Sequence, residues 1–593
     1  MEELLIPNDS THDVTSFDIL VDGNLLNPAY EIISVSIIRE VNRIPIAQIV
    51  VRDGEASLSN FEISESDDLI PGKKIILKIG RDGNNQQAFK GIITKQAIKV
   101  KSNGDTALYI ECRDEAVKMT IGRKNKYHEN LKDSKLFDDL VGAPQYAGIS
   151  SDPDETTVTH KELVQHNISD WDFLLLRAEA NGMLVTVKDG VVKTFRPNTS
   201  GEPVVQVTYG SSVLEFEAEM DVRNQWKSVK AFSWDYANQK LFDAETSEAA
   251  NFTQHGNISG STLAEAVNLS DYHLQHSGHV LEQELQAWTD GLMLRSRLAK
   301  IRGRARVSGF AGVKPGDMVK LAGVGNRFKG NAFVTAVKQE ITNNVWESHI
   351  QFGLDPERYA AVYKDISEPL TAGLMGGIHG LQIGKVVRLA SDPDGEDRIQ
   401  VKIPTIDSNA QGIWSRVACL DAGSERGTFF RPELEDEVIV GFINDDPNDA
   451  IILGMLNSSA KPAPLQASDD NHEKGIFTRS KMRVHFHDQT KTITIDTPAG
   501  NSIKLDEQGK TIEIKDQNQN KVTMSPTGVK MDSPKNIDIS AGVNLTLKAG
   551  TLLTIGGATL SVKADGNVSI EGAMTTINAS GITEVKGSMV KIN

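Results

Sequence analysis

The sequence predicts a mainly β protein with a barrel-rich N-terminal part, a few helices, a small OB-type barrel and a C-terminal rod of short strands. Three observations predict this class. Short runs of alternating apolar and polar residues dominate the chain, and only two segments stand out with helical periodicity. From Gln489 to Asn593 the strand-like runs continue without a single aromatic residue. A chain that stays in short strands for so long is not building an ordinary globular core.

The C-terminal runs repeat with a short period. Ile537, Leu545 and Leu553 lie eight residues apart, and Gly or Pro punctuation recurs at a similar step. Eight residues make one strand and one corner, whereas a three-sided coil of a single chain needs roughly twenty. We therefore expect three chains to wind together into an intertwined trimeric β-helix or prism, because no chain could bury its apolar row alone. The alternative is an ordinary antiparallel sheet domain.

Composition narrows the function classes. The net charge is −17, which has the wrong sign for a general nucleic-acid binder. Cys112 and Cys419 are far apart and are expected to be small core residues rather than a disulfide pair. The N-terminus lacks the basic and apolar regions of a secretory signal, and no stretch is apolar enough to span a membrane. We expect synthesis in the cytoplasm and export, where it occurs, by another route.

The first part of the chain, residues 1–375, is expected to hold two β-rich units with inserted helices. Strand-like runs from about Phe17 to Cys112 predict a first small barrel. Ser169 begins a capping pattern for a helix that Gly182 ends, and a second helix is predicted over 281–300. Strands return between the two helices and again from 302 to 352, and they predict a second β-rich unit.

A glycine-rich break at 373–380 separates this part from the next. Five strand-like runs within residues 381–457 have the size of an OB-type barrel. Residues 458–477 contain the Pro-rich stretch Lys461-Pro-Ala-Pro and are predicted to be a stiff linker. Residues 478–593 are predicted to form the rod.

Several motifs, in order along the chain, resemble the VgrG-type spike proteins of contractile injection systems. In the OB-type barrel these are Arg398-Ile-Gln-Val-Lys-Ile-Pro, Trp414-Ser-Arg-Val and Arg431-Pro-Glu-Leu-Glu-Asp-Glu. In the first part they are Ser169-Asp-Trp-Asp-Phe-Leu and Val313-Lys-Pro-Gly-Asp-Met. The turn after Asn444 and the Ser/Pro-rich stretch after Ser458 most resemble spikes of extracellular particles of the antifeeding-prophage and Photorhabdus virulence cassette type. Type VI secretion spikes are a close second.

The resemblance implies a fold and a function. A trimeric hub of residues 1–375 would present two tube-like barrels per chain to a sixfold inner tube, the OB barrel would be the neck, and the rod would be a needle. Sheath contraction would drive this needle through a target envelope, so the membrane is met only on firing. Implied partners are further copies of the chain, the inner tube protein, baseplate proteins and a PAAR-like tip protein, with effector cargo as a further candidate. The expected docking residues of the tip protein are Met589, Val590, Lys591, Ile592 and Asn593.

No motif predicts an enzyme or a cofactor. His485 and His487 put two imidazoles on one side of a strand and are weak candidates for a metal site on a trimer axis, although two solvent-facing histidines are the simpler interpretation. Nucleophile-elbow and metalloprotease motifs are absent from the sequence. A carbohydrate-processing β-helix tailspike is the competing hypothesis, but such enzymes stack sugars on aromatic residues, which the rod lacks. A non-enzymatic, envelope-puncturing spike is therefore favoured.

Overall fold

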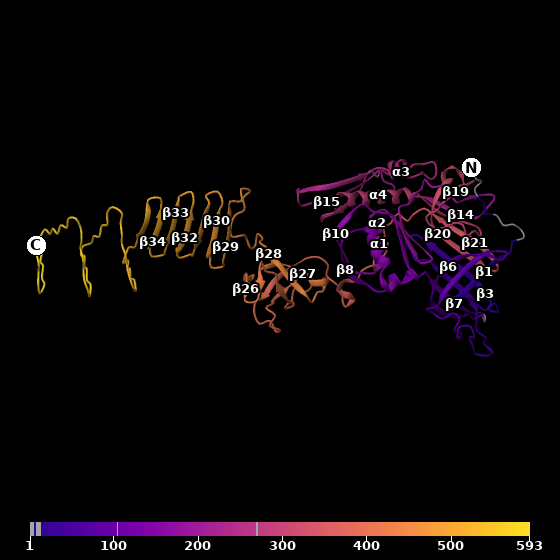
Figure 1. Cartoon of the computed structure of the whole chain (residues 1–593), viewed down its shortest axis with the longest axis horizontal. Helices are drawn as coiled ribbons and strands as arrows, with labels where there is room; N and C mark the ends of the chain where they lie inside the picture. Colours follow the sequence, from indigo (N-terminus) through magenta and orange to yellow (C-terminus); the bar gives the residue numbers. More distant parts are fainter. Residues whose placement is uncertain (1–4, 8–12, 103–104, 269–270, 593) are drawn as a thin grey trace. The chain divides into compact units, whose positions relative to one another are not determined.

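The computed structural model describes residues 5–7, 13–102, 105–268 and 271–592 (Figure 1). The chain divides into two compact units, residues 1–455 and 456–593, which are described separately. Within the described residues no helix is long and apolar enough to cross a membrane.

The first unit is built on one large sheet. Among the described residues thirteen strands join it, in the order β14-β18-β21-β20-β3-β4-β7-β6-β5-β1-β2, with β13 and β19 attached at β20. The strands are β1 (Thr15–Val21), β2 (Asn24–Leu25), β3 (Ile32–Glu40), β4 (Ile46–Arg52), β5 (Lys74–Arg81), β6 (Asn84–Val100), β7 (Thr106–Arg113), β13 (Val205–Thr208), β14 (Val213–Met220), β18 (Ile301–Ser308), β19 (Met318–Ala322), β20 (Gly330–Thr342) and β21 (Val345–Phe352).

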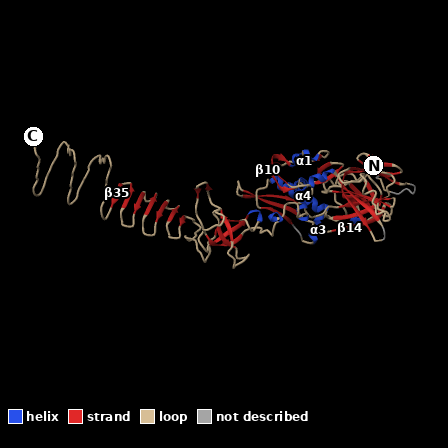
Figure 2. Cartoon of the chain, turned by 90° about the horizontal axis from the view of Figure 1, so that it is seen from below, coloured by secondary structure: helices blue, strands red, loops and turns tan. Residues whose placement is uncertain are grey.

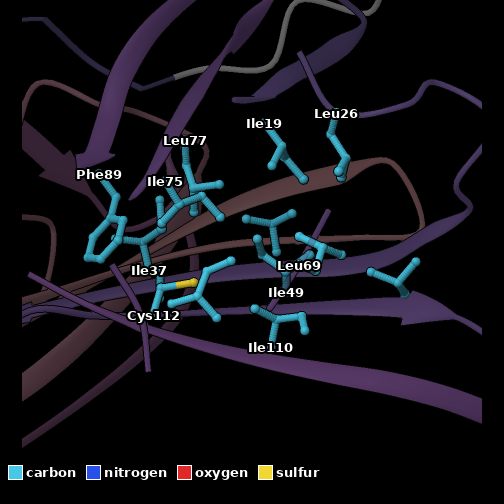
Figure 3. Close-up of a cluster of buried hydrophobic side chains, with 14 of the residues drawn as sticks. Ile19, Leu26, Ile37, Ile49, Leu69, Ile75, Leu77, Phe89, Ile110 and Cys112 are labelled. Carbon is cyan, nitrogen blue, oxygen red and sulfur yellow. The ribbon is translucent and has the colours of Figure 1, made fainter. Parts of the chain in front are cut away.

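Two hydrophobic cores share this sheet. One gathers β1 and β3–β7 around Ile37, Ile49, Leu77 and Cys112, as Figure 3 shows, and the other gathers β13, β14 and β18–β21. The antiparallel pairing of β20 with β3 joins the two halves. The two barrels expected from the sequence are therefore two cores on a continuous sheet rather than separate domains. At the junction β20 pairs with β21 on one edge and with β3 on the other, so neither of these strands leaves a free edge between the halves.

Helices, short turns and small sheets form further elements of the first unit. The helices are α1 (Asp133–Val141), α2 (Asp170–Ala180), α3 (Gly260–Ala266), α4 (Glu282–Leu298), α5 (Gly325–Phe328) and α6 (Tyr359–Val362), and short 3₁₀ turns are η1 (Glu115–Thr120), η2 (Pro144–Tyr146), η3 (Leu370–Gly373) and η4 (Ile443–Asp445). The small sheets are β8 (Lys124–Lys132) with β10 (Thr159–Ile168), β9 (Ser150–Pro153) with β11 (Leu184–Lys188) and β12 (Val191–Phe195), and β15 (Ser228–Asp235) with β16 (Lys240–Thr246) and β17 (Asp271–His276).

Both predicted helices are present. The Ser169 hydroxyl accepts a hydrogen bond from the Asp172 backbone N–H at 3.0 Å, which caps α2 as expected. Gly182 follows the helix with a φ of +66°, and a Cβ there would lie 2.7 Å from the Cα of Gly291 in α4. This close approach of two glycines lets α2 and α4 pack against each other.

A buried charge cluster ties α1, β10, α2 and α4 together. The Arg177 guanidinium donates two hydrogen bonds of 2.8 Å to the Asp133 carboxylate and another of 2.8 Å to Glu284. His160 Nε2 lies 3.0 Å from Asp133 Oδ2, and the Asn181 amide donates to the same oxygen at 2.8 Å. Burial alone would raise the pKa of Asp133, but these donors outweigh it and hold the pKa below its ordinary value. The cluster is therefore a fully paired ionic core.

The last part of the first unit is a closed barrel. It is formed by β22 (Gln382–Arg388), β23 (Ile399–Lys402), β24 (Ile413–Val417), β27 (Glu437–Phe442) and β28 (Ala450–Met455), closed in the order β22-β23-β24-β28-β27, with the hairpin β25 (Ala422–Gly423) and β26 (Arg426–Gly427) in one loop. This agrees with the OB-type barrel predicted over 381–457. The prediction for the cysteines was half wrong: Cys112 is buried, but Cys419 is exposed, because it lies in the loop after β24.

The second unit begins with a meander of seven antiparallel strands, all of them in described residues. These are β29 (Glu473–Phe477), β30 (Arg483–His487), β31 (Thr492–Asp496), β32 (Ser502–Asp506), β33 (Thr511–Lys515), β34 (Lys521–Ser525) and β35 (Gly528–Asp532). The first of these strands lies inside the segment predicted as linker, so the sheet starts at Glu473. Asp506 and Asp516 fix two of the turns by accepting backbone N–H bonds from Gly509 and Asn520.

No strand is formed from 533 to 592, all of which the structure describes. Figure 2, coloured by secondary structure, draws strands as far as β35 and loop beyond it. The alternating residues predicted to be strands there are present but unpaired within one chain. Pairing between chains stays a prediction.

Candidate functional site

The sheet of the second unit has one apolar and one polar face. Strand register aligns two apolar rows on the same face: Ile476, Val484, Ile495, Ile503, Ile514, Val522 and Met531 in one, and Phe486, Ile493, Leu505, Ile512, Met524 and Val529 in the other. Ten of these thirteen side chains are 40–66% exposed. Such a face must be covered to stabilise the sheet, and within the described residues no other element covers it.

The opposite face carries charged and hydroxyl side chains. Arg483 pairs with Asp496 at 2.7 Å, Lys504 with Asp506 at 2.9 Å and Lys521 with Glu513 at 2.5 Å. These pairs lie on or between neighbouring strands and remain in contact with solvent, so each adds little stability. Because the burial of a row of paired charges is unfavourable, these pairs indicate that the polar face of the sheet lies in solvent.

His485 and His487 lie on this polar face, between Val484 and Phe486 of the apolar one. Their ring centroids are 6.4 Å apart, and His472 stacks on His487 at 6.0 Å. His485 Nε2 is 3.4 Å from a Glu473 carboxylate oxygen. In the described part of the chain no group of three or more His, Cys, Asp or Glu residues is placed to hold a metal ion. If the apolar faces meet on an axis, these histidines point away from it, which removes the reason for a metal there.

The predicted tip-docking residues lie at the end of the unpaired segment. Met589 is 75%, Val590 48% and Ile592 90% exposed, and Lys591 is exposed too. Asn593 lies outside the described residues. Because the described residues of this set are exposed and contact no partner that would identify a docking surface, the docking assignment stays a prediction.

Sequence reasoning missed a second exposed apolar region, in the barrel. Leu420, Phe429 and Phe430 are exposed in the loop between β24 and β27. Their signal is visible in the sequence: two adjacent aromatics follow a turn instead of alternating within a strand.

Sequence comparison identifies the family of the first unit. Residues 11–343, more than half of the chain, match the family model described as the Alg8 N-terminal domain, and the chain therefore belongs to this family. Residues 382–456, the closed barrel, match the model described as the type VI secretion system/phage-baseplate injector OB domain.

Two curated proteins are similar to the chain. The type VI secretion system spike protein VgrG1b of Pseudomonas aeruginosa is 22% identical over 453 residues, covering 70% of this chain and 59% of that protein. The spike protein VgrG3 of Vibrio cholerae is 29% identical over 115 residues, covering 18% of this chain and 11% of that protein. The chain thus spans less than two thirds of the length of either relative.

Solved structures show a looser likeness. The tail protein of Neisseria meningitidis MC58 has a TM-score of 0.43 at 15% identity, over 58% of this chain and 97% of that one. The E. coli c3393 protein, a type VI secretion component, has a TM-score of 0.35 at 12% identity, over 74% and 99%.

The OB-domain match and the two curated relatives make the chain similar to VgrG-type spike and phage-baseplate injector proteins. The resemblance derived from the sequence motifs is confirmed at this level. The finer resemblance to spikes of extracellular particles stays a prediction.

Proposed function

We propose that the chain is the trimeric central spike of a phage-tail-like contractile injection system. In this role residues 1–375 join the inner tube and baseplate, and the C-terminal unit forms the needle that punctures a target envelope when the sheath contracts. Similarity to VgrG spikes supports the class, and the motifs around Asn444 and Ser458 favour an extracellular particle over a type VI machine. Beyond Gln489 the sequence contains no aromatic residue on which a sugar could stack, which argues against a sugar-processing tailspike.

The observation that carries the proposal is the one-sided sheet of residues 473–532. Three copies packed with their apolar faces toward a common axis would bury both rows and leave the charged faces in solvent. Full burial of one such side chain stabilises by about 1.5–3 kcal/mol, so covering half-exposed rows of this length contributes on the order of 10 kcal/mol per chain. Two copies face to face would also cover the rows, but the eight-residue step beyond Asp532 favours three.

The unpaired segment 533–592 supports the same arrangement. Its apolar residues Leu545, Leu547 and Leu553 are 52–59% exposed, and its backbone has no strand partner in its own chain. Backbone N–H and C=O groups need partners wherever they leave water. Two further copies, running alongside, would supply both the hydrogen bonds and the apolar cover.

The tube-binding role of the hub can be tested by deletion. We expect the full chain to be recovered with the inner tube protein of the same injection system. A chain lacking residues 1–370 should lose the tube protein and keep the mass of a trimer in light scattering. Recovery of the tube protein by the shortened chain would contradict the assignment of the binding surface to the hub.

The end of the needle is proposed to bind a small PAAR-like tip protein. Met589, Val590 and Ile592 would form an apolar triangle where three chains lie side by side, and an exposed apolar surface recruits partners or aggregates. We expect the full chain to pull down the tip protein and a chain ending at Gly581 to recover at least tenfold less. Equal recovery by both chains would show that the tip protein docks elsewhere.

A further inference from the structure

Two cationic side chains are buried at the end of α4. Arg297 belongs to the last turn of the helix and is 3% exposed, and Lys300 follows it by three residues and is 1% exposed. Lysine and arginine are almost never fully buried unless negative charge pairs with them. The charge balance around these two residues therefore indicates what the surrounding site binds.

In the part of the chain that the structure describes, one carboxylate pairs with these two cations. The Arg297 Nε–H donates to Glu248 Oε1 at 2.8 Å, but the Glu248 side chain is 60% exposed, so solvent weakens the pair. The Lys300 ammonium donates to two backbone carbonyls, those of His255 and Ile258, each at 2.6 Å. Carbonyl groups satisfy its N–H groups but carry no net charge. The site thus holds one more positive charge than negative charge.

The pKa of Lys300 reflects this imbalance. Burial and then repulsion by Arg297 lower the pKa of Lys300 to about 8, and attraction by Glu248 does not offset them. A further negative charge in the site would raise this pKa toward its ordinary value.

One nitrogen of the Arg297 guanidinium has no acceptor. Nη1 donates to the Trp226 carbonyl at 3.0 Å, whereas Nη2 is buried and has no hydrogen-bond partner among the described residues. Leaving a buried donor of a charged group unpaired is costly. Such an atom therefore indicates the position of a bound acceptor.

A small cavity adjoins this guanidinium. Its volume is about 20 Å³, which is room for one particle of the size of a water molecule. The polar part of its lining, all of it in described residues and without a carboxylate, comes from Thr199, Thr253, His255, Arg297 and Asn331. Hydroxyl and amide groups such as those of Thr253 and Asn331 can donate to an anion. The cavity is too small for phosphate or sulfate, but a single-atom anion fits.

We propose that this cavity binds a chloride ion, held by the Nη2–H group of Arg297. A water molecule would supply the acceptor that Nη2 needs, but it would leave the excess positive charge in place. Chloride supplies both the acceptor and one negative charge, which equals the excess. The inference concerns a single chain and is independent of the spike proposal.

The ion would fix the segment 252–258 between the helices and the large sheet. The Thr253 N–H donates to the Thr199 hydroxyl at 2.6 Å, so the backbone of the segment lies at the lining of the cavity. The His255 ring centroid lies 6.0 Å from that of Phe352 in β21. We therefore expect the segment to open more often when the anion is removed.

Hydrogen exchange of the full chain tests the site. Chloride is titrated at constant ionic strength against gluconate, which is too large for the cavity. At ten times its dissociation constant chloride should slow amide exchange in 252–258 about tenfold, because binding lowers the open population by that factor. The amides of β31 and β32 in the second unit should exchange equally in both salts. In crystals of the full chain soaked in bromide, an anomalous peak is expected beside Arg297 Nη2.

Two variants test the residues of the site. Asn331→Asp puts a fixed carboxylate of similar size into the lining, so its exchange should be slow in gluconate and independent of chloride. Arg297→Lys keeps the charge but removes Nη2, so its exchange should be fast in both salts. Arg304→Lys changes a half-exposed arginine of β18 and is the matched control, which should keep the chloride dependence of the wild type. If Arg297→Lys does not fold, Asn331→Asp still decides.

Two results would overturn the proposal. Equal exchange of the wild type in chloride and gluconate, or a bromide map without the peak, would assign the cavity to a water molecule. Such a water could also donate to the carbonyl oxygen of Gln225, which is buried without a partner among the described residues. A chloride effect retained by Asn331→Asp would place the anion elsewhere in the chain.

Discussion

Ile503→Asp should leave the purified chain monomeric at micromolar concentration, whereas Lys504→Asp should leave it trimeric. The two residues are adjacent in β32 and lie on opposite faces of the sheet. In a trimer with its apolar faces inward, the first change puts three carboxylates close to the axis. The second puts them in solvent, where it removes an exposed ion pair with Asp506 worth up to about 1 kcal/mol and adds an exposed repulsion of at most similar size with Glu513 on the next strand.

The expected difference is large because a buried, unpaired carboxylate costs several kcal/mol, and three of them would also repel one another. Light scattering gives the mass, and far-ultraviolet circular dichroism checks that the hub remains folded. If both variants stayed trimeric, the apolar rows would not face the axis. If both became monomeric, the sheet would be too fragile for the comparison to locate an inner face, and the trimer model would lose its main support.

Asp133→Ala should destabilise the first unit by about 3–5 kcal/mol. The change removes the carboxylate that accepts hydrogen bonds from Arg177, His160 and Asn181, and it leaves the Arg177 guanidinium largely buried with Glu284 as its remaining partner. Breaking a buried pair on one side typically has an effect of this size. Asp138→Ala, at an exposed position in the same helix, is the matched control and should change stability by less than about 0.5 kcal/mol. Urea unfolding followed by tryptophan fluorescence measures both.

The pH dependence of this difference has a definite sign. The pKa of Asp133 is lower in the folded chain than its ordinary value of 3.8, so the folded state binds fewer protons than the unfolded one. The contribution of Asp133 is therefore complete above about pH 5 and is lost as the pH falls below 3.8. The stability gap between wild type and Asp133→Ala should narrow below pH 4. A gap that widened there would contradict the paired carboxylate.

Much of the fold follows from local sequence signals. Ser169 and Gly182 mark the ends of α2 because capping and left-handed backbone depend on single residue types. The OB-type barrel follows from five short alternating runs. The single sheet of the hub could not be predicted, because the pairing of β20 with β3 joins strands about three hundred residues apart and leaves no local signal.

The candidate site was predictable only in outline. Alternation in residues such as Thr492-Ile-Thr-Ile-Asp496 shows that one face is apolar, but it does not show whether the strand pairs within its own chain. The structure separates 473–532, where each chain pairs its own strands, from 533–592, where it does not. The outward direction of Ile451 and Leu453 in β28 could not be predicted for a related reason: they flank the buried Ile452, and a continuous apolar run does not show which residues point outward.

The unpaired segment 533–592 also bears on the order of assembly. A repeat of eight residues allows three chains to align equally well after a slip of eight, and a slipped needle would end with uneven tips. The sheet of residues 473–532 repeats with a different step of nineteen residues, because β29, β31 and β33 begin at Glu473, Thr492 and Thr511. A slip of eight residues therefore misaligns the sheet, and the two steps together admit one alignment. Pairing of the three chains that starts in the sheet and proceeds toward the C-terminus would therefore align the eight-residue repeats correctly. On this view the sheet acts as a template that holds the three identical chains in one alignment before residues 533–592 pair with one another.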